Sequence, residues 1–349
     1  SAIGADALYA NTTGSHNHAV GPDALYQNTS GISNVAFGTN ALKQNTTGNK
    51  NSAMGQNALN DNTTASYNVA VGYDALYANT TGEYNTATGY QALNDNTTAD
   101  YNTATGYQAL YENTTAAGSS AFGYEALKVN TTGDMNSAFG REALQNNTTG
   151  YYSVAVGFLG LGSCTTGYCN VAVGKGAVYE CTTGDFNTGI GYRAGDNTQT
   201  GNNNTSIGYD AEPTDGTASN EVTLGNSSIS ALRCEVQTIT SLSDRRDKKD
   251  IKELPVGLDF INDLNPVKFV WNKRDGSKKG IQEIGFIAQD LDESQINADA
   301  ENYLNLVLKN NPNKLEASYG KLVPILVKAL QELSTKNDAL EARIAALEA

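Results

Sequence analysis

The chain has 349 residues, which is long enough for more than one folding unit. Its formal net charge is −14 and is unevenly spread: residues 1–242 hold 7 Lys and Arg against 19 Asp and Glu, whereas residues 243–349 hold 16 against 18. The acidic first part has no basic stripe, which argues against a nucleic-acid partner. The sequence shows no signal peptide and no apolar run of about 18 residues, so we expect no membrane insertion.

A glycine recurs every 17 residues from Gly4 to Gly225 without interruption. A period this strict over two thirds of a chain is typical of a stacked solenoid in which each repeat forms one coil. We therefore predict a mostly β fold: a parallel β-solenoid of 17-residue coils over residues 1–225. About 13 coils at ~4.8 Å each would give a rod of roughly 60 Å.

Each coil is expected to contain two short extended pieces and a closing turn. In the coil that starts at Asn85, the pieces are Thr86 to Thr88 and the segment around Ala92 and Leu93. The segment Asn-Thr-Thr-(Gly/Ala) that follows is rich in residues that favour turns, because their side chains bond the nearby backbone.

Columns of like residues predict which side chains face inward. Ala lies two residues before the glycine in ten successive coils, and Ala and Leu usually lie three and four residues after it. These columns predict a thin interior. The position just before the glycine is also often apolar, although neighbours on a strand face opposite sides. We therefore expect this outer face to be buried by partner chains, packed side by side about a threefold axis.

Two further columns consist of Asn and of Tyr residues. The Asn column from Asn11 to Asn147 predicts an amide ladder along the stack. Tyr73, Tyr90, Tyr107 and Tyr124 form a column after the glycine, which fits packing at a coil edge or, alternatively, an aromatic strip for sugar rings.

Cysteine and histidine give little sign of a metal or cofactor site. Cys164 and Cys181 lie one period apart, so they are either a ladder of buried thiols or a disulfide. Cys169 and Cys234 have no partner at a whole number of periods. Without a Cys/His cluster we predict no metal and no cofactor. The two histidines, His16 and His18, lie in one coil and are expected to be exposed, although an ion on a trimer axis stays an alternative.

The repeats of the type Asn-x-Ala-x-Gly-x-x-Ala-Leu resemble the head repeats of trimeric autotransporter adhesins. The resemblance covers roughly residues 1–225 and implies left-handed parallel β-rolls that trimerise side by side. The period of 17 is longer than the usual repeat of that family.

After Gly225 the period stops. Residues 226–242 read as a neck of alternating strand with Ile229, Leu232, Val236 and Ile239. Three features follow: Ser-Asp-x-Arg-x-Lys from residue 243, Gly-Phe-Ile-Ala-Gln from residue 285, and an amphipathic helix at the end. Together they resemble the intramolecular chaperone domain of phage tail fibres and tailspikes, also called peptidase S74. We expect a small α+β globular part over residues 243–321 and a coiled-coil helix over 322–349.

The resemblance implies a domain that trimerises, helps the fibre before it to fold, and then cuts itself off. The cleavage site falls between Leu242 and Ser243, with Ser243 as nucleophile and Lys248 as paired base. A lysine can serve as base if burial or neighbouring cations favour its neutral form. Lys249, Arg245 and Arg246 act in that direction, whereas Asp244 and Asp247 oppose it. The alternative is a solvated helix start with Ser243 as its N-cap.

The last helix shows a heptad seam whose spacings alternate between three and four, as a coiled coil requires. A polar residue at an a position, here Asn337, tends to fix register and strand number. The seam comprises Val323, Leu326, Leu330, Leu333, Asn337, Leu340, Ile344 and Leu347.

These features predict the distal part of a homotrimeric phage tail fibre. The resemblance implies three kinds of partner: two further copies of the chain, an upstream fibre or tail protein, and a host surface receptor, expected to be a glycan. The expected location is the virion, with the chaperone domain made in the host cytoplasm and released after a single-turnover cut. The alternative is the stalk or head of a cellular trimeric adhesin without enzymatic activity.

Overall fold

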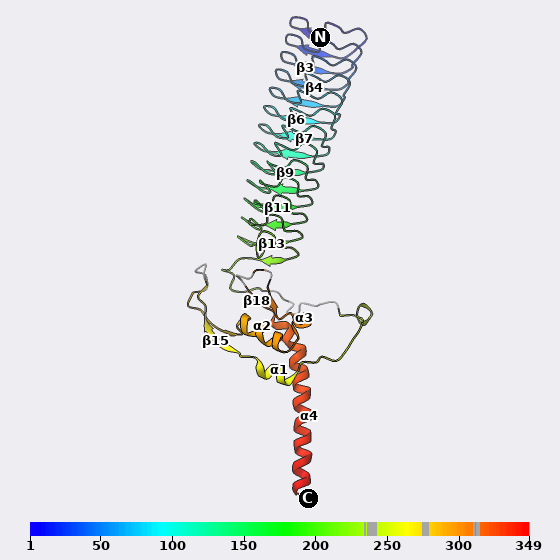
Figure 1. Ribbon diagram of the computed structural model, residues 1–349. Helices are drawn as coiled ribbons and strands as arrows, with labels where there is room; N and C mark the ends of the chain where they lie inside the picture. Colours follow the sequence, from blue (N-terminus) through cyan, green and yellow to red (C-terminus); the bar gives the residue numbers. More distant parts are fainter. Residues whose placement is uncertain (234, 236–242, 274–278, 310, 312–314, 349) are drawn as a thin grey trace. The chain divides into compact units, whose positions relative to one another are not determined.

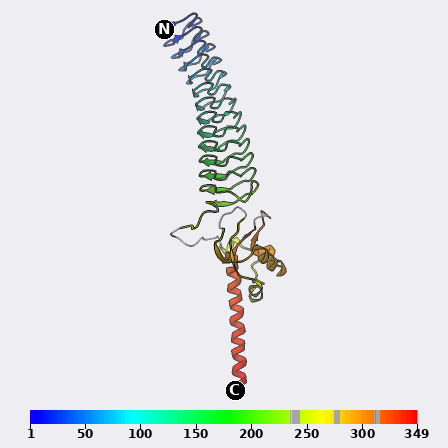
Figure 2. The ribbon, with the colours of Figure 1, turned by 90° about the vertical axis from the view of Figure 1, so that its left-hand side faces the viewer.

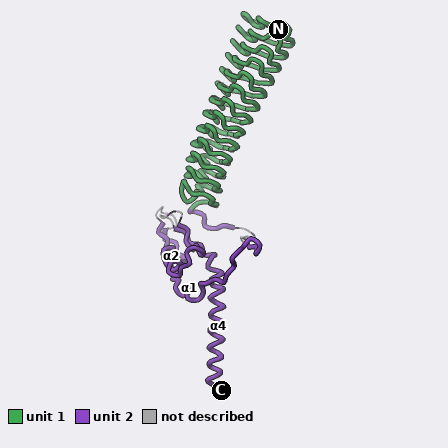
Figure 3. Tube along the Cα trace, turned by 45° about the vertical axis from the view of Figure 1, so that its right-hand side comes forward, with its two compact units in different colours: residues 1–226 green, residues 227–349 purple. Residues whose placement is uncertain are grey.

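The computed structural model describes residues 1–233, 235, 243–273, 279–309, 311 and 315–348. The chain divides into two compact units, Ser1–Asn226 and Ser227–Ala349, which Figure 3 colours separately. The first unit is a mostly β structure and the second combines short helices, two small sheets and a long terminal helix. Among the described helices, none is both long and apolar enough to cross a membrane.

The first unit is a parallel β-solenoid, which confirms the predicted fold. One short strand per coil joins a single fourteen-stranded sheet in strict chain order, seen as stacked arrows in Figures 1 and 2. Each strand pairs with the next at an offset of 17 residues, as in Ala87 opposite Ala104. The strands are β1 (Ala2–Ile3), β2 (His18–Val20), β3 (Val35–Phe37), β4 (Ser52–Met54), β5 (Val69–Val71), β6 (Thr86–Thr88), β7 (Thr103–Thr105), β8 (Ser120–Phe122), β9 (Ser137–Phe139), β10 (Val154–Val156), β11 (Val171–Val173), β12 (Thr188–Ile190), β13 (Thr205–Ile207) and β14 (Val222–Leu224).

The period-marking glycines are required by the close approach of successive coils. Gly106 has a φ of +140°, and a Cβ built on it would meet the carbonyl group of Gly123 in the next coil, with the carbonyl carbon at 2.7 Å. No side chain fits at that distance, and L-residues rarely adopt this φ. The same contact with the carbonyl of the next glycine recurs from Gly4 to Gly191, so one steric cause explains the period over these coils.

The predicted interior is confirmed, but the prediction of a second extended piece in each coil is wrong. Ala87, Ala92 and Leu93 are fully buried, like their counterparts in the neighbouring coils. The segment around Ala92 and Leu93 forms turns instead of a strand, with positive φ at Gln91 and Leu93. A strand would turn consecutive side chains to opposite faces. Because positive φ at Gln91 and Leu93 alternates with negative φ at Ala92, the side chains of Ala92 and Leu93 can both face inward. The Leu93 amide still donates a hydrogen bond to the carbonyl of Ala109 at 3.0 Å.

The predicted amide ladder is present. The Nδ2 of Asn96 donates to Oδ1 of Asn79 at 2.8 Å, and the Nδ2 of Asn113 donates to Oδ1 of Asn96 at 2.9 Å. Each of these side chains is fully buried and also donates to a carbonyl of its own coil, as Asn96 does to Ala99. The ladder satisfies buried polar groups in every coil that it crosses.

A second buried Asn column was missed by sequence reasoning. Asn85 Oδ1 accepts from the backbone amide of Asn102, and Asn85 Nδ2 donates to the carbonyl of Ala99, at 2.9 and 2.8 Å. The Asn of the Asn-x-Ala-x-Gly motif therefore joins successive coils through the backbone. Asn recurs at this position from Asn17 to Asn204, with Ser119 and Ser153 as the exceptions, and this recurrence was the available signal.

Breaking the ladder should weaken the coils next to the break. We expect Asn96→Ala to cost about 1–3 kcal/mol of local stability, because Asn79 Oδ1 and Asn113 Nδ2 both lose a buried partner. Hydrogen exchange of amides in the two neighbouring coils measures this loss. Gln56→Ala, at an exposed amide outside the ladder, should change exchange little; equal effects of the two variants would refute the ladder's role.

The second unit has a small core of its own. It contains η1 (Arg245–Asp247), α1 (Leu258–Asp263), β15 (Val267–Val270), β16 (Gln282–Gly285), α2 (Ala288–Asn297), α3 (Glu301–Leu304), β17 (Val307–Leu308), β18 (Glu316–Ala317), η2 (Tyr319–Lys321) and α4 (Leu322–Glu348). β15 and β16 form one antiparallel pair, and β17 and β18 form another. Phe260, Leu291 and Leu306 pack in the core against Leu322 and Ile325 at the base of α4.

The predicted strand of the neck is absent from residues 227–233, the stretch of it that the structure describes continuously. Ile229 and Leu232 are exposed there. Val236 and Ile239 lie outside the described residues.

Candidate active site

Ser243 and Lys248 are brought together at the start of the second unit. The Nζ of Lys248 donates a hydrogen bond to Oγ of Ser243 at 2.6 Å. The short 3₁₀ helix η1 lies between the two residues and turns the chain back, so that five positions of sequence separation become direct contact. This is the distance at which an amine, once neutral, could accept the hydroxyl proton.

The neighbouring charges are arranged so that Lys248 is not held by a carboxylate. The Asp244 carboxylate forms a salt bridge with Arg246 at 2.6 Å. The hydrogen bond from the Arg246 side chain holds the pKa of the Asp244 carboxyl below its usual range. Within the described ranges, Lys248 has no acidic side chain within salt-bridge distance. Asp244 thus pairs with the guanidinium of Arg246 and not with Lys248.

The alternative in which Ser243 caps the following helix is wrong. Asp244 is the N-cap of η1, and its carboxylate accepts from the backbone amide of Arg246 at 2.8 Å. A carboxylate next to the helix start takes the capping position, which leaves the Ser243 hydroxyl to Lys248. Both Ser243 and Lys248 are exposed to solvent in the single chain. Leu242, on the other side of the predicted cleavage site, lies outside the described residues.

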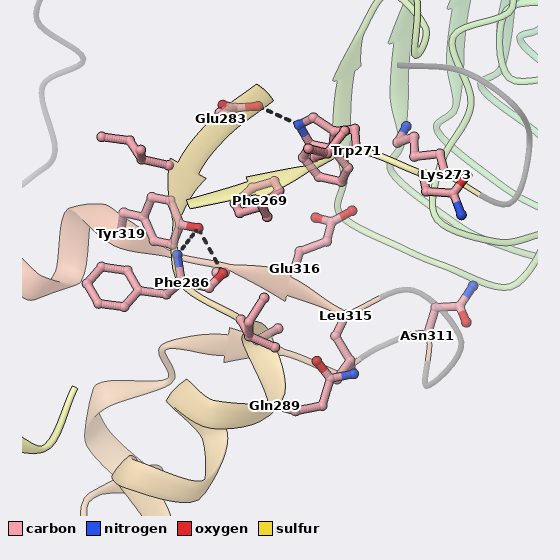
Figure 4. A pocket seen from close by; sticks show the side chains of 16 residues that line it. Phe269, Trp271, Lys273, Glu283, Phe286, Gln289, Asn311, Leu315, Glu316 and Tyr319 are labelled. Atoms are coloured by element: carbon pink, nitrogen blue, oxygen red, sulfur yellow. Dashed lines mark hydrogen bonds between the residues drawn. The ribbon is translucent and has the colours of Figure 1, made fainter. Parts of the chain in front are cut away.

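The Gly-Phe-Ile-Ala-Gln motif forms one wall of an open hollow of about 1220 Å³ in the second unit (Figure 4). The hydroxyl of Tyr319 accepts from the Phe286 amide at 3.1 Å and donates to the Phe286 carbonyl at 3.3 Å. Trp271 donates to Glu283 at 2.5 Å. The motif therefore positions the end of β16 and the start of α2 against aromatic side chains.

The terminal helix has two apolar faces. Leu322, Ile325 and Ala329 are buried against the unit's own core, and Glu332 accepts from the Leu258 amide at 2.8 Å. The predicted seam lies on other positions and is exposed: Leu330 at 65%, Leu340 at 53% and Leu347 at 86%. Asn337 bonds within its own helix, to Glu341. The single chain leaves the seam without a cover.

The tyrosine column is part of a longer stack along the solenoid. The rings of Tyr73, Tyr90, Tyr107 and Tyr124 lie nearly parallel with centroids 5.1–5.3 Å apart. The stack then continues through cations and rings one coil apart: Arg141, Phe158, Lys175, Tyr192 and Tyr209. Between the two end rings, each ring has a neighbouring ring or cation on both faces. This supports the packing interpretation over an aromatic strip for sugars.

Cys164 and Cys181 continue the Asn column as free thiols. Each is buried and donates to a glycine carbonyl of its own coil at 3.4 Å. The neighbouring Cys181 thiol and burial raise the pKa of the Cys164 thiol, which keeps it protonated. The ladder of thiols is therefore the arrangement found. The described residues hold no cluster of three or more potential metal-ligating side chains. Cys234 lies outside them.

Residues 243–300 match the Peptidase_S74 family, described as chaperone of endosialidase. The matched segment begins at Ser243 and includes Lys248 and the Gly-Phe-Ile-Ala-Gln motif. No curated protein and no solved structure matches the chain. The molecule is thus a parallel β-solenoid followed by a chaperone domain. More specifically, the second unit carries a Peptidase_S74 domain, a combination consistent with a phage tail fibre or tailspike with an intramolecular chaperone.

Proposed function

We propose that the chain is the distal part of a homotrimeric phage tail fibre for host attachment. Its second unit trimerises, sets the order of the three rods and then separates by cutting the bond between Leu242 and Ser243. The contact between Lys248 Nζ and Ser243 Oγ at 2.6 Å carries the proposal, because it places a base on the first residue of the chaperone match.

The cut can proceed with the residues of this chain. Neutral Lys248 takes the Ser243 hydroxyl proton, and Oγ attacks the carbonyl carbon of Leu242. The peptide C–N bond breaks as the C–O ester bond forms, and the Ser243 nitrogen receives the proton. Water then hydrolyses the ester, which leaves a carboxylate on Leu242 and a free amine and hydroxyl on Ser243.

Trimerisation offers a reason for the cut to wait until assembly. Burying an amine favours its neutral form, and Lys248 is exposed in the single chain. Packing of partner copies over this segment would supply the missing burial. A cut that follows assembly makes the fibre kinetically trapped, since the chaperone can no longer reverse its own work.

The exposed seam of α4 supports a trimer. We expect light scattering of the wild-type chain to give three copies per particle. Leu333→Lys with Leu340→Lys should reduce this to one copy, because charges replace the apolar seam. Thr335→Lys, on the outer side of the heptad, is the matched control and should stay trimeric. A wild-type particle of one copy would refute the fibre proposal.

The host receptor is proposed to be a surface glycan, and an upstream fibre or tail protein is proposed to join the chain to the virion. A glycan array probed with the full chain tests the first part. Binding of defined sugars would support an adhesive rod, whereas the absence of any binding would favour a passive spacer. Failure of the chain to cut itself, together with a trimeric mass, would favour the cellular adhesin instead.

A further inference from the structure

The strands of the solenoid present an outer face that the chain itself leaves uncovered. Each strand turns its middle residue inward and its first and third residues outward. The third residues form one outer column, and many of them are exposed: Phe37 at 55%, Phe139 at 40% and Ile190 at 42%. The outer column comprises Phe37, Met54, Val71, Thr88, Thr105, Phe122, Phe139, Val156, Val173, Ile190, Ile207 and Leu224.

The occupant that fits this face is a second copy of the chain. From β3 to β14, neither the first nor the third strand residues include an ionisable side chain, although the chain carries a net charge of −14. Like-charged copies can therefore approach each other here with the least repulsion. The face repeats once per coil along the full length of the rod, and a second copy has the same length and the same repeat.

An apolar column alone does not fix the axial alignment of two such rods. When one rod shifts by one coil along another, apolar residues still face apolar residues. Only the contacts of one coil at each end of the rods are lost. The α4 seam does not prevent this either. The 16 residues from Ser227 to Leu242 form a chain that can span about 50 Å, far more than the ~4.8 Å of one coil.

Two adjacent coils interrupt the apolar column. β6 and β7 both read Thr-Ala-Thr, so that Thr88 and Thr105 stand where the neighbouring coils carry Val71 and Phe122. Phe122 and Phe139 follow directly as a stacked pair with centroids 5.0 Å apart. The outer column thus carries a polar block of two layers beside an aromatic block of two layers.

We propose that Thr88 and Thr105 set the axial register of the rods. In register, hydroxyls of different copies lie at one level and can bond to one another, since each hydroxyl both donates and accepts. A shift by one coil keeps one hydroxyl pair, Thr88 against Thr105, but puts the other Thr105 against Phe122 and the other Thr88 against Val71. Those two hydroxyls are then buried without partners. This inference rests on the proposed trimer and adds a second alignment device within the rod.

Disulfide trapping in the full chain tests the register. Chains carrying Val156→Cys are oxidised alone, and are also co-expressed with chains carrying Val173→Cys, which lie one coil away. We expect 156–156 links to outnumber 156–173 links clearly, because one coil adds ~4.8 Å along the axis to the separation of the two Cα atoms, and disulfides form at about 4.4–6.8 Å. With Thr88→Val and Thr105→Val added, 156–173 links should rise to an amount comparable with the 156–156 links.

The matched control is Thr86→Val with Thr103→Val, which makes the same change in the same strands at their first residues, where Val69 and Val154 occur naturally. It should keep the links in register. Equal amounts of 156–173 and 156–156 links in the wild-type background, or no rise of the 156–173 links in the Thr88 and Thr105 variant, would overturn the register assignment. A trimeric mass without any disulfide links would refute only the claim that the outer faces of the copies pack against each other. A monomeric mass would refute the proposed function.

Discussion

Ser243→Ala should leave the chain uncut at its full mass of 36.8 kDa on a denaturing gel, while the wild type separates into two pieces. Without Oγ there is no nucleophile on the residue after the proposed scissile bond. Ser243→Cys keeps a nucleophile at the same place and should restore cutting. Mass measurement of the product ends checks the position, which should fall between Leu242 and Ser243.

Lysine variants separate the proposed base from its charged neighbours. Lys248→Met should slow cutting by about 10²–10⁴-fold, the usual contribution of a positioned base. Lys249→Met is the matched control and should cut at nearly the wild-type rate. Equal slowing by both variants, with the trimer intact in each, would show that the 2.6 Å contact between Lys248 and Ser243 has no special role.

An ester intermediate gives this mechanism a further signature. Hydroxylamine attacks esters faster than water does, so adding it to freshly assembled wild-type protein should speed the appearance of the two pieces. The Ser243→Ala chain should not respond, since it cannot form the ester. Cutting of that variant at the same bond would contradict the proposed role of Ser243.

The second large effect is expected in the rod. Gly106→Ala should cost roughly 3 kcal/mol or more, because the new Cβ falls on the carbonyl group of Gly123 at a φ of +140°. The backbone of the next coil cannot move away without breaking its own pairing. Loss of protection in hydrogen exchange around β7 and β8 measures the effect, with the trimeric mass measured in parallel.

A matched glycine in another column serves as control. A Cβ at Gly82 would also meet a carbonyl group, that of Ala99, but Ala65, Ala99 and Ala116 occupy this column in other coils. Its φ is not in the left-handed region, so small shifts of the turn accommodate a methyl group. Gly82→Ala should change protection little. A similar loss for both variants would show that the strict period has a cause other than this contact.

Local pattern was enough to predict much of the fold. The 17-residue glycine period, the Ala and Leu columns and the Asn ladder each follow from contacts between one coil and the next. Such contacts repeat at a fixed sequence separation, so they are visible as columns. The prediction for the segment around Ala92 and Leu93 was wrong because two consecutive apolar residues also fit a strand that is buried on both faces. Only the backbone φ angles show that both side chains face the interior of the coil.

The candidate site was predictable only in part. The order Ser243, Lys248 and Gly-Phe-Ile-Ala-Gln carried the resemblance, but sequence spacing did not show whether serine and lysine touch. Capping of η1 by Asp244 and its pairing with Arg246 decide that point, and both depend on the turn. The continuation of the tyrosine column through Arg141, Phe158 and Lys175 was likewise overlooked, since a cation between rings does not look like an aromatic repeat.

The sequence by itself determined that this chain winds into coils of equal length and ends in a chaperone domain with a heptad helix, because these properties depend on periodic or consecutive residues. Only the tertiary structure decided which side chains remain uncovered: the outer face of the strands, the seam of α4 and the hydroxyl of Ser243 beside Lys248. The physical reason is that exposure depends on where backbone turns place side chains in space, and residues that share a column or a motif do not share a surface until the chain has folded.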